Sequence, residues 1–152
     1  MRVHLGSDHA GFALKEVVAG HLRAAGHDVV DCGAATYAEN DDYPAYCIDA
    51  ATRTAADPQS FGIVLGGSGN GEAIAANKVR GVRAALCAST ELARLAREHN
   101  DANVLSLGAR FVDESAALAV VDAFLATPFS GTARHVRRIA QITTYEAAAV
   151  SG

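Results

Sequence analysis

The sequence has no tryptophan, a single methionine and only three cysteines. Because Cys32, Cys47 and Cys87 are widely spaced and odd in number, they favour a reducing compartment over a disulfide framework. No hydrophobic run approaches about 18 residues, so no transmembrane helix is expected. The segment Met1–Leu5 leads directly into a mixed sequence, without the long apolar core of a signal peptide. These absences predict a cytoplasmic location.

Positive charge is also scarce, since 13 Lys and Arg face 17 Asp and Glu and the net charge is −4 at pH 7. This balance gives no reason to expect nucleic acid or an anionic membrane as a partner. No group of His, Cys and Asp has the spacing of metal ligands, so we predict no metal and no cofactor. Half of the residues are hydrophobic, and a chain of this length can bury one core, which predicts a single domain over residues 1–152.

Short hydrophobic segments alternate with helical ones along the chain. The expected strands lie near residues 3–5, 28–32, 61–65, 82–87 and 104–107. The expected helices lie near residues 12–25, 45–54, 73–78, 90–98, 113–127 and 130–149. This alternation is typical of an α/β fold in three layers, in which a doubly wound parallel sheet is covered by helices on both faces.

A glycine-rich turn, Gly66-Gly67-Ser68-Gly69-Asn70-Gly71-Glu72, joins one expected strand to the helix that follows it. Its glycines remove side chains, so that backbone N–H groups can converge on an anion. Because ligands of such folds bind at the carboxyl ends of the strands, Asp8, His9 and Arg110 are expected at the same edge as this turn. An anion cradle beside the Glu72 carboxylate suits proton abstraction next to a carbonyl.

Other interpretations of this turn were compared with the catalytic one. A phosphate-binding loop of the NTPase type needs Lys where Glu72 stands, and a carboxylate there would repel phosphates. The spacing Gly67-x-Gly69-x-Gly71 also differs from the Gly-x-Gly-x-x-Gly of dinucleotide-binding folds. The remaining alternative is a turn that only packs closely, with Glu72 stabilising the helix dipole.

The other candidate residues also have structural interpretations. Asp8 is a common helix cap, and the adjacent His9 fits a structural role as well as a functional one. His99 and Asn100 are expected at a helix end, on the wrong edge of the sheet for a site in their own chain. They could serve a site only through a neighbouring subunit or an unusual loop path.

The expected last helix carries basic residues near its start. Arg134 and Arg138 are four residues apart and face the same way on a helix. With His135 and Arg110 they suit a phosphate clamp, and a solvated basic surface is the alternative. The apolar residues further along the helix indicate packing against something, for which a second subunit is one candidate.

Five motifs, in order and over nearly the whole chain, together resemble type B ribose-5-phosphate isomerases. The wider family also includes galactose-6-phosphate and allose-6-phosphate isomerases. The motifs are Gly6–Gly11, Asp31–Gly33, Asp42–Pro44, Gly66–Glu72 with Ala75–Lys78, and Glu98–Asn100. The resemblance implies a five-stranded Rossmann-like sheet, an extended C-terminal helix and isomerisation between aldose and ketose without a metal. It also implies a homodimer, sometimes a tetramer, with sites shared between subunits.

The resemblance further implies catalytic roles. Many family members carry a catalytic Cys at the position of Gly66, which cannot be a base. An actinobacterial-like branch uses a Glu just after the glycine turn, and Glu72 matches it. His99 would then help to open the sugar ring, with Asp8 assisting, and Ser68 would take part in proton transfer or hold a hydroxyl.

The implied substrate contacts come from several segments. The residues implied in binding the phosphate are Arg110, Arg134 and Arg138, with His9 nearby, and those implied in contacting the sugar are Tyr43 and Asn100. The residues expected to surround an enediolate are Gly67, Ser68, Gly69, Asn70 and Gly71. We therefore expect interconversion of ribose 5-phosphate and ribulose 5-phosphate through a cis-enediolate. The alternatives are isomerisation of allose 6-phosphate, galactose 6-phosphate or a tetrose phosphate, and a non-catalytic sugar-phosphate sensor.

Overall fold

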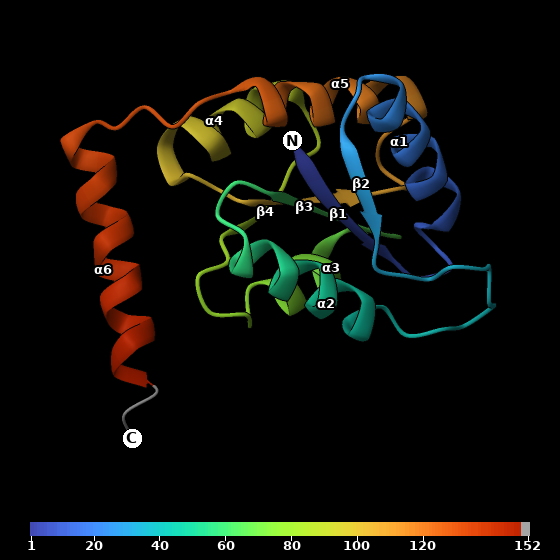
Figure 1. Cartoon of the computed structure of the whole chain (residues 1–152), viewed down its shortest axis with the longest axis horizontal. Helices are drawn as coiled ribbons and strands as arrows, with labels where there is room; N and C mark the ends of the chain where they lie inside the picture. The colour runs from blue at the N-terminus through green and yellow to red at the C-terminus, as the bar shows by residue number, and fades with distance from the viewer. Residues whose placement is uncertain (150–152) are drawn as a thin grey trace.

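The computed structural model of the chain describes residues 1–149 and shows a five-stranded sheet between two layers of helices (Figure 1). The strands are β1 (Arg2–Ser7), β2 (Asp28–Asp31), β3 (Phe61–Gly66), β4 (Ala84–Leu86) and β5 (Val104–Gly108). The helices are α1 (Phe12–Ala24), α2 (Tyr43–Ala56), α3 (Asn70–Ala76), α4 (Thr90–Asn100), α5 (Glu114–Ala126) and α6 (Ala133–Ala149). The strand order is β2-β1-β3-β5-β4 and every pairing is parallel. The predicted doubly wound α/β fold is confirmed.

The two faces of the sheet have different cores. Helices α1, α4 and α5 cover one face, and α2 and α3 cover the other (Figure 1). Successive residues of β3 point to opposite faces, so Ile63 and Leu65 pack with Phe124 of α5, whereas Val64 packs with α2. The second core consists mainly of alanine and valine, with Cys47 among them. Small side chains there let α2 and α3 lie close to the sheet, which brings the glycine turn against the strand ends.

Several element boundaries differ from the sequence expectation, among them those of α3, β4 and α6. Helix α3 begins at Asn70, inside the glycine turn, rather than near residue 73. Strand β4 begins at Ala84 rather than at residue 82, because the Arg83 N–H donates to the Asn103 side chain at 2.8 Å instead of to a strand neighbour. Helix α6 begins at Ala133, since the Thr132 carbonyl accepts its first helical N–H bonds from His135 and Val136.

Helix α6 projects from the body (Figure 1). Its first part lies near the end of α4, and further along Glu146 accepts the Gly81 N–H at 3.3 Å. Its residues Val136, Ile142 and Tyr145 are exposed although they are apolar. A cavity of about 530 Å³ lies between this helix and the segment around β4, with Ile139 and Val82 in its lining. Within residues 1–149, this helix therefore presents an apolar face that the chain itself does not cover. No helix in this part of the chain is both long and apolar enough to cross a membrane.

Candidate active site

The carboxyl ends of three adjacent strands place the first group of candidate residues. In the register of the sheet, Ser7 lies beside Leu65 and Gly66 lies beside Gly108. The turn after β5 is tied to the turn after β3, because the Ala109 N–H donates to the Gly66 carbonyl at 2.8 Å. The segments that carry Asp8, the glycine turn and Arg110 therefore meet at one edge of the sheet, as the sequence predicted.

Glu72 lies in the first turn of α3 and is only 4% exposed. Its carboxyl group occupies the space directly over Gly66: a Cβ built on Gly66 would overlap with Oε1 and Cδ of Glu72. A side chain at position 66 and the carboxyl group of Glu72 therefore exclude each other in this arrangement. This gives a steric reason for finding glycine at position 66 together with a glutamate at position 72.

The environment of Glu72 favours its protonated form. Burial raises the pKa of this carboxyl group above its ordinary value, and the charge of Asp8 adds to the effect, while the N–H groups of Glu72 and Gly69 act against it. A carboxylate with a raised pKa is a better proton acceptor at neutral pH. Cys47 is the nearby thiol, and burial raises its pKa, with the charges of Glu72 and Asp8 adding, so this thiol stays protonated and is not a nucleophile.

The glycine turn is held by contacts that need its glycines. Gly69 has φ +79°, and the Ser106 hydroxyl donates to its carbonyl at 2.7 Å. The Ser68 hydroxyl accepts from both the backbone N–H and the side-chain amide of Asn70, each at 3.3 Å. The turn therefore has one defined conformation, in which Ser68 is tied to the first residue of α3.

Two side chains lie against this turn where a larger residue would not fit. A Cβ at Gly71 would lie 2.5 Å from the Tyr43 hydroxyl, and a Cβ at Gly67 would lie 3.1 Å from Nη1 of Arg110. Glycine thus lets the Tyr43 ring and the Arg110 guanidinium approach the turn from α2 and from the end of β5. Both residues were predicted to bind substrate, and the structure places both beside the turn.

Asp8 and His9 lie close to Asp41, a residue that the sequence analysis did not single out. The Asp8 Oδ1 accepts the backbone N–H groups of Ala10 and Gly11 at 3.0 and 3.3 Å. His9 Nδ1 lies 3.0 Å from Oδ1 of Asp41, which comes from the loop between β2 and α2. Possible ligand atoms of Asp8, His9 and Asp41 lie within 4.8 Å of one another, but the short contact has the length of a hydrogen bond. The one sequence signal for Asp41 was its place in an acidic run next to Tyr43.

The second group of candidate residues lies at the opposite edge, where the strands begin. His99 and Asn100 end α4 immediately before β5, and the His99 ring lies 4.3 Å from the His135 ring, centroid to centroid. Arg134 Nη2 lies 3.3 Å from His135 Nε2. His135 is buried, and burial lowers its pKa, with the charges of His99, Arg134 and Arg138 adding. Because β5 alone spans about 16 Å, these side chains do not meet Glu72 within one chain.

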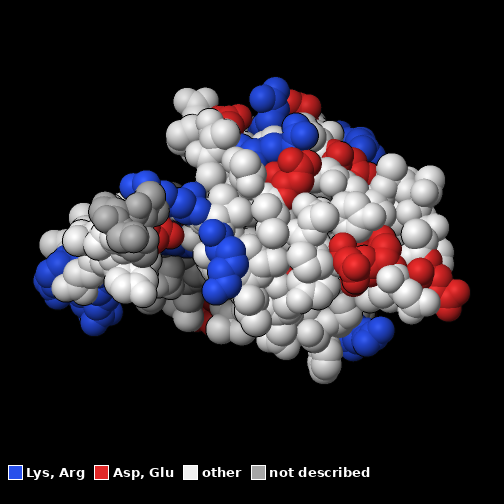
Figure 2. All heavy atoms as spheres, turned by 90° about the horizontal axis from the view of Figure 1, so that it is seen from below, with Lys and Arg blue, Asp and Glu red and all other residues white. Residues whose placement is uncertain are grey.

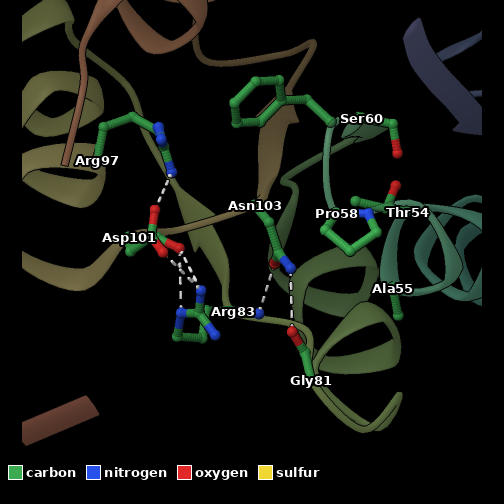
Figure 3. A pocket seen from close by; sticks show the side chains of 10 residues that line it. Thr54, Ala55, Pro58, Ser60, Gly81, Arg83, Arg97, Asp101 and Asn103 are labelled. Atoms are coloured by element: carbon green, nitrogen blue, oxygen red, sulfur yellow. Dashed lines mark hydrogen bonds and ion pairs between the residues drawn. The ribbon is translucent and has the colours of Figure 1, made fainter.

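An ion-pair network fixes the end of α4 (Figure 3). Asp101 has φ +45° and follows Asn100 directly. Its carboxylate accepts from Arg97 Nη1 at 2.8 Å and from Arg83 Nη2 at 3.2 Å. These residues line a cavity of about 300 Å³ at the edge where the strands begin. Because their charged groups pair with one another, the network acts as a support for the helix end that carries His99.

In Figure 2, basic side chains lie around the projecting helix and also on the body, where acidic side chains lie beside some of them. The arginines on this helix are Arg134, Arg137 and Arg138. Of these, Arg134 and Arg138 were predicted to bind phosphate, and both are exposed at the opposite edge of the sheet from Arg110. The predicted phosphate clamp is therefore split between the two edges.

Comparison with known proteins identifies the family. The family model described as Ribose/Galactose Isomerase matches residues 3–142. The chain belongs to this family. It is 60% identical over 146 residues to ribose-5-phosphate isomerase B of Mycolicibacterium paratuberculosis, covering 96% of this chain and 92% of that protein. The protein of the same name from Mycobacterium tuberculosis H37Rv is 58% identical, covering 96% and 90%.

Solved structures of the ribose/galactose isomerase family share the fold. The crystal structure of ribose-5-phosphate isomerase B from Mycoplasma genitalium with bound ribulose-5-phosphate has a TM-score of 0.92 and 42% identity, and covers 95% of each chain. The type B enzyme of Trypanosoma cruzi has a TM-score of 0.91 and 43% identity, covering 97% of this chain and 99% of that one. The resemblance predicted from the five motifs is confirmed.

Within this family's fold, the predicted site residues form two groups. At the carboxyl edge are the residues Asp8, His9, Tyr43, Gly67, Ser68, Gly69, Asn70, Gly71, Glu72 and Arg110. At the opposite edge are the residues His99, Asn100, Arg134 and Arg138. Asp41, which was not predicted, joins the first group. His135, which the sequence offered only as a possible member of the phosphate clamp, joins the second.

Proposed function

We propose that this chain interconverts D-ribose 5-phosphate and D-ribulose 5-phosphate. Relatives named ribose-5-phosphate isomerase B, up to 60% identical, support this activity. So does the similar fold of a family member with bound ribulose-5-phosphate. The observation that carries the chemistry is the buried carboxyl group of Glu72, which has a raised pKa and lies over Gly66 beside the glycine turn.

The reaction begins with the closed furanose ring of the substrate. An acid/base group must protonate the ring oxygen and take the proton of the anomeric hydroxyl, and His99 can do this because an imidazole has one donor and one acceptor nitrogen. Asp8 assists at the carboxyl edge. Opening the ring produces the free aldehyde at C1, which makes the hydrogen on C2 acidic enough to be removed.

Glu72 then acts as the base. It takes the proton from C2, and the electrons of the C–H bond form the C1=C2 double bond of a cis-enediolate. Backbone N–H groups of the glycine turn stabilise the developing oxyanion, and one such donor is worth about 2.7–4 kcal/mol. Glu72 returns the proton to C1 while the hydroxyl on C2 becomes the ketone. Ser68 transfers the hydroxyl proton from the oxygen on C2 to the oxygen on C1. The phosphate remains unreacted and is held by arginines, which orients the carbon chain.

The complete site requires two copies of the chain. Glu72 and Arg110 lie at one edge of the sheet, whereas His99, Arg134 and Arg138 lie at the other, so one chain does not supply both groups to one substrate. The uncovered apolar face of α6, with Val136 and Ile142 exposed, suits burial against a second copy. We therefore infer a homodimer in which each site combines the two edges.

The Glu72→Gln substitution tests the proposed base. The amide keeps the size of the side chain but cannot accept the proton from C2, so we expect turnover to be abolished and substrate binding to be largely kept. A coupled isomerase assay and a binding titration with ribose 5-phosphate measure the two effects. Near-normal turnover by this variant would refute Glu72 as the base.

The same assay separates the alternative functions. Wild-type protein is tested on ribose 5-phosphate, allose 6-phosphate, galactose 6-phosphate and a tetrose phosphate, with and without a chelator. We expect fastest conversion of ribose 5-phosphate, unchanged by chelation. Faster conversion of another sugar phosphate would show that this sugar phosphate is the preferred substrate. Binding without any conversion would indicate a sensor. Loss of activity on chelation would contradict a mechanism without metal.

A further inference from the structure

The acidic loop between β2 and α2 contacts the histidine at the end of β1 through a single carboxylate. Asp41 Oδ1 accepts the His9 backbone N–H at 2.7 Å and lies 3.0 Å from His9 Nδ1. The two residues are 32 positions apart in the chain. The Asp41 side chain is 10% exposed, so the contact is largely shielded from water. One carboxylate therefore fixes both the backbone and the ring of His9.

This contact decides which ring nitrogen of His9 is available. An ionised carboxylate only accepts hydrogen bonds, so the proton shared with Asp41 belongs to Nδ1. Within residues 1–149, no hydrogen bond involves His9 Nε2, and this atom is not among the buried unpaired ones. Nε2 is therefore the nitrogen that a ligand can reach.

The charged groups around His9 come from three segments. Asp8 Oδ2 lies 3.9 Å from His9 Nδ1, which is beyond hydrogen-bond distance. From α2, Tyr46 faces Asp41, and its pKa is raised by burial and by the charge and hydrogen bond of Asp41, with Asp42 adding. The Tyr46 hydroxyl thus stays neutral, and Asp41 is the carboxylate in direct contact with the ring.

The strand order suggests what Nε2 contacts. Because β3 lies between β1 and β5, His9 and Arg110 flank the glycine turn from its two sides. The Arg110 guanidinium lies against Gly67 and was predicted to bind phosphate. An anion beside this turn would therefore have a guanidinium on one side and the imidazole on the other.

We propose that Asp41 is a positioning residue, which holds His9 so that a protonated Nε2 donates a hydrogen bond to a phosphate oxygen of the substrate. This rests on the proposed function, because the ligand is the phosphate of the sugar phosphate. In the complex the ring lies between two anions, Asp41 at Nδ1 and the phosphate at Nε2. Both stabilise an imidazolium, and charge-assisted hydrogen bonds of this kind are about twice as strong as neutral ones.

The substitution Asp41→Asn tests this role. The amide oxygen can still accept the His9 backbone N–H, so the loop keeps its anchor, while the charge facing the ring is lost. We expect the KM for ribose 5-phosphate and the inhibition constant for inorganic phosphate to rise about tenfold, with kcat within about threefold of wild type. His9→Gln should weaken phosphate inhibition at least as much, and the double variant should be no worse than His9→Gln alone.

Asp42→Asn is the matched control. Asp42 is the neighbouring carboxylate, is exposed, and makes no side-chain capping bond to α2, so both constants should stay at their wild-type values. Nitrogen NMR of the histidine side chains gives a second readout. With saturating inorganic phosphate, His9 Nε2 should show a hydrogen bond to phosphate in the wild type, and this hydrogen bond should be weakened in Asp41→Asn.

Three results would overturn the proposal. The inhibition constant for phosphate could be unchanged in Asp41→Asn, or it could be unchanged in His9→Gln. The third is a double variant in which the effects of the two substitutions on this constant add. The phosphate and NMR measurements need no turnover. If wild-type protein binds phosphate as described but converts no sugar phosphate, the proposed function fails while the role of Asp41 is supported.

Discussion

At the scale of single residues, a glycine and a carboxylate depend on each other. The carboxyl group of Glu72 fills the space where a side chain at position 66 would lie, and it is buried there with a raised pKa. The sequence showed that Gly66 cannot be a base and that Glu72 is close in the chain. Only the structure shows that the two positions share one volume, so a side chain added at position 66 must displace the Glu72 carboxyl group.

Gly66→Ala should therefore inactivate the protein, although the added methyl group is not reactive. The new Cβ overlaps with the Glu72 carboxyl group, which has to move away from the glycine turn. Because a displacement of about 1 Å costs roughly 100-fold in rate, we expect kcat to fall by about that factor. Steady-state kinetics measure this effect. A variant within threefold of wild type would show that Glu72 can act from another position.

Gly20→Ala serves as the control for this change. Gly20 lies in α1, is exposed, and has no atom within 4 Å of its added Cβ. Alanine is favoured over glycine inside a helix by roughly 1 kcal/mol. This variant should keep wild-type kinetics and melt at the same or a higher temperature.

At the scale of elements, side chains that support helix ends position the candidate groups. Asn77, just after α3, brackets the first residue of β4: its amide donates to the Ala84 carbonyl at 2.9 Å and its oxygen accepts the Ala84 N–H at 2.8 Å. At the end of α4, Asp101 takes a left-handed conformation and pairs with Arg83 and Arg97. This helix end positions His99 and Asn100.

Asp101→Ala should destabilise the fold and reduce activity together. Alanine is strained at φ +45°, and the nearly buried guanidinium of Arg97 loses its carboxylate. We expect the free energy of unfolding to fall by about 1–3 kcal/mol, measured by urea denaturation. Asp101→Asn should lose less, because asparagine tolerates this conformation and keeps one acceptor. Equal losses in the two variants would show that the backbone strain contributes nothing.

At the scale of the whole molecule, the candidate groups are divided between two edges of one sheet. The glycine turn, Asp8 and Arg110 lie at the carboxyl ends of the parallel strands. His99 of α4 and the two predicted phosphate-binding arginines of α6 lie at the opposite ends. Helix α6 projects from the body and leaves apolar residues exposed (Figure 1). This shape supports the proposed dimer, in which a second copy would complete each site.

Mixing two inactive variants tests this arrangement. In a mixed dimer of Glu72→Gln and His99→Asn, one of the two shared sites contains both wild-type residues. After unfolding and refolding together, random pairing should restore about a quarter of wild-type activity.

The control mixes Glu72→Gln with Asp8→Asn. Both substitutions lie at the same edge, so each shared site keeps one of them and no activity should return. A failure of the first mixture to recover activity, with both proteins refolded, would contradict a site shared between subunits.

The sequence by itself determined the type and order of the elements, and it predicted which residues carry the chemistry. The doubly wound sheet was predicted from the strand and helix periods, the glycine turn and the order of the motifs. Because ligands of such folds bind at the carboxyl ends of the strands, Asp8, Glu72 and Arg110 were expected together. These features depend on local patterns and on the general geometry of parallel sheets, which a sequence carries directly.

The tertiary structure alone decided which distant residues touch. Asp41 contacts His9 across 32 positions, and the His135 ring lies against the His99 ring, because loops and helix ends are placed by packing rather than by sequence period. The space shared by Gly66 and Glu72 likewise exists only once α3 packs against the end of β3. Side-chain contacts of this kind depend on the shape of the folded core, and no spacing along the chain encodes that shape.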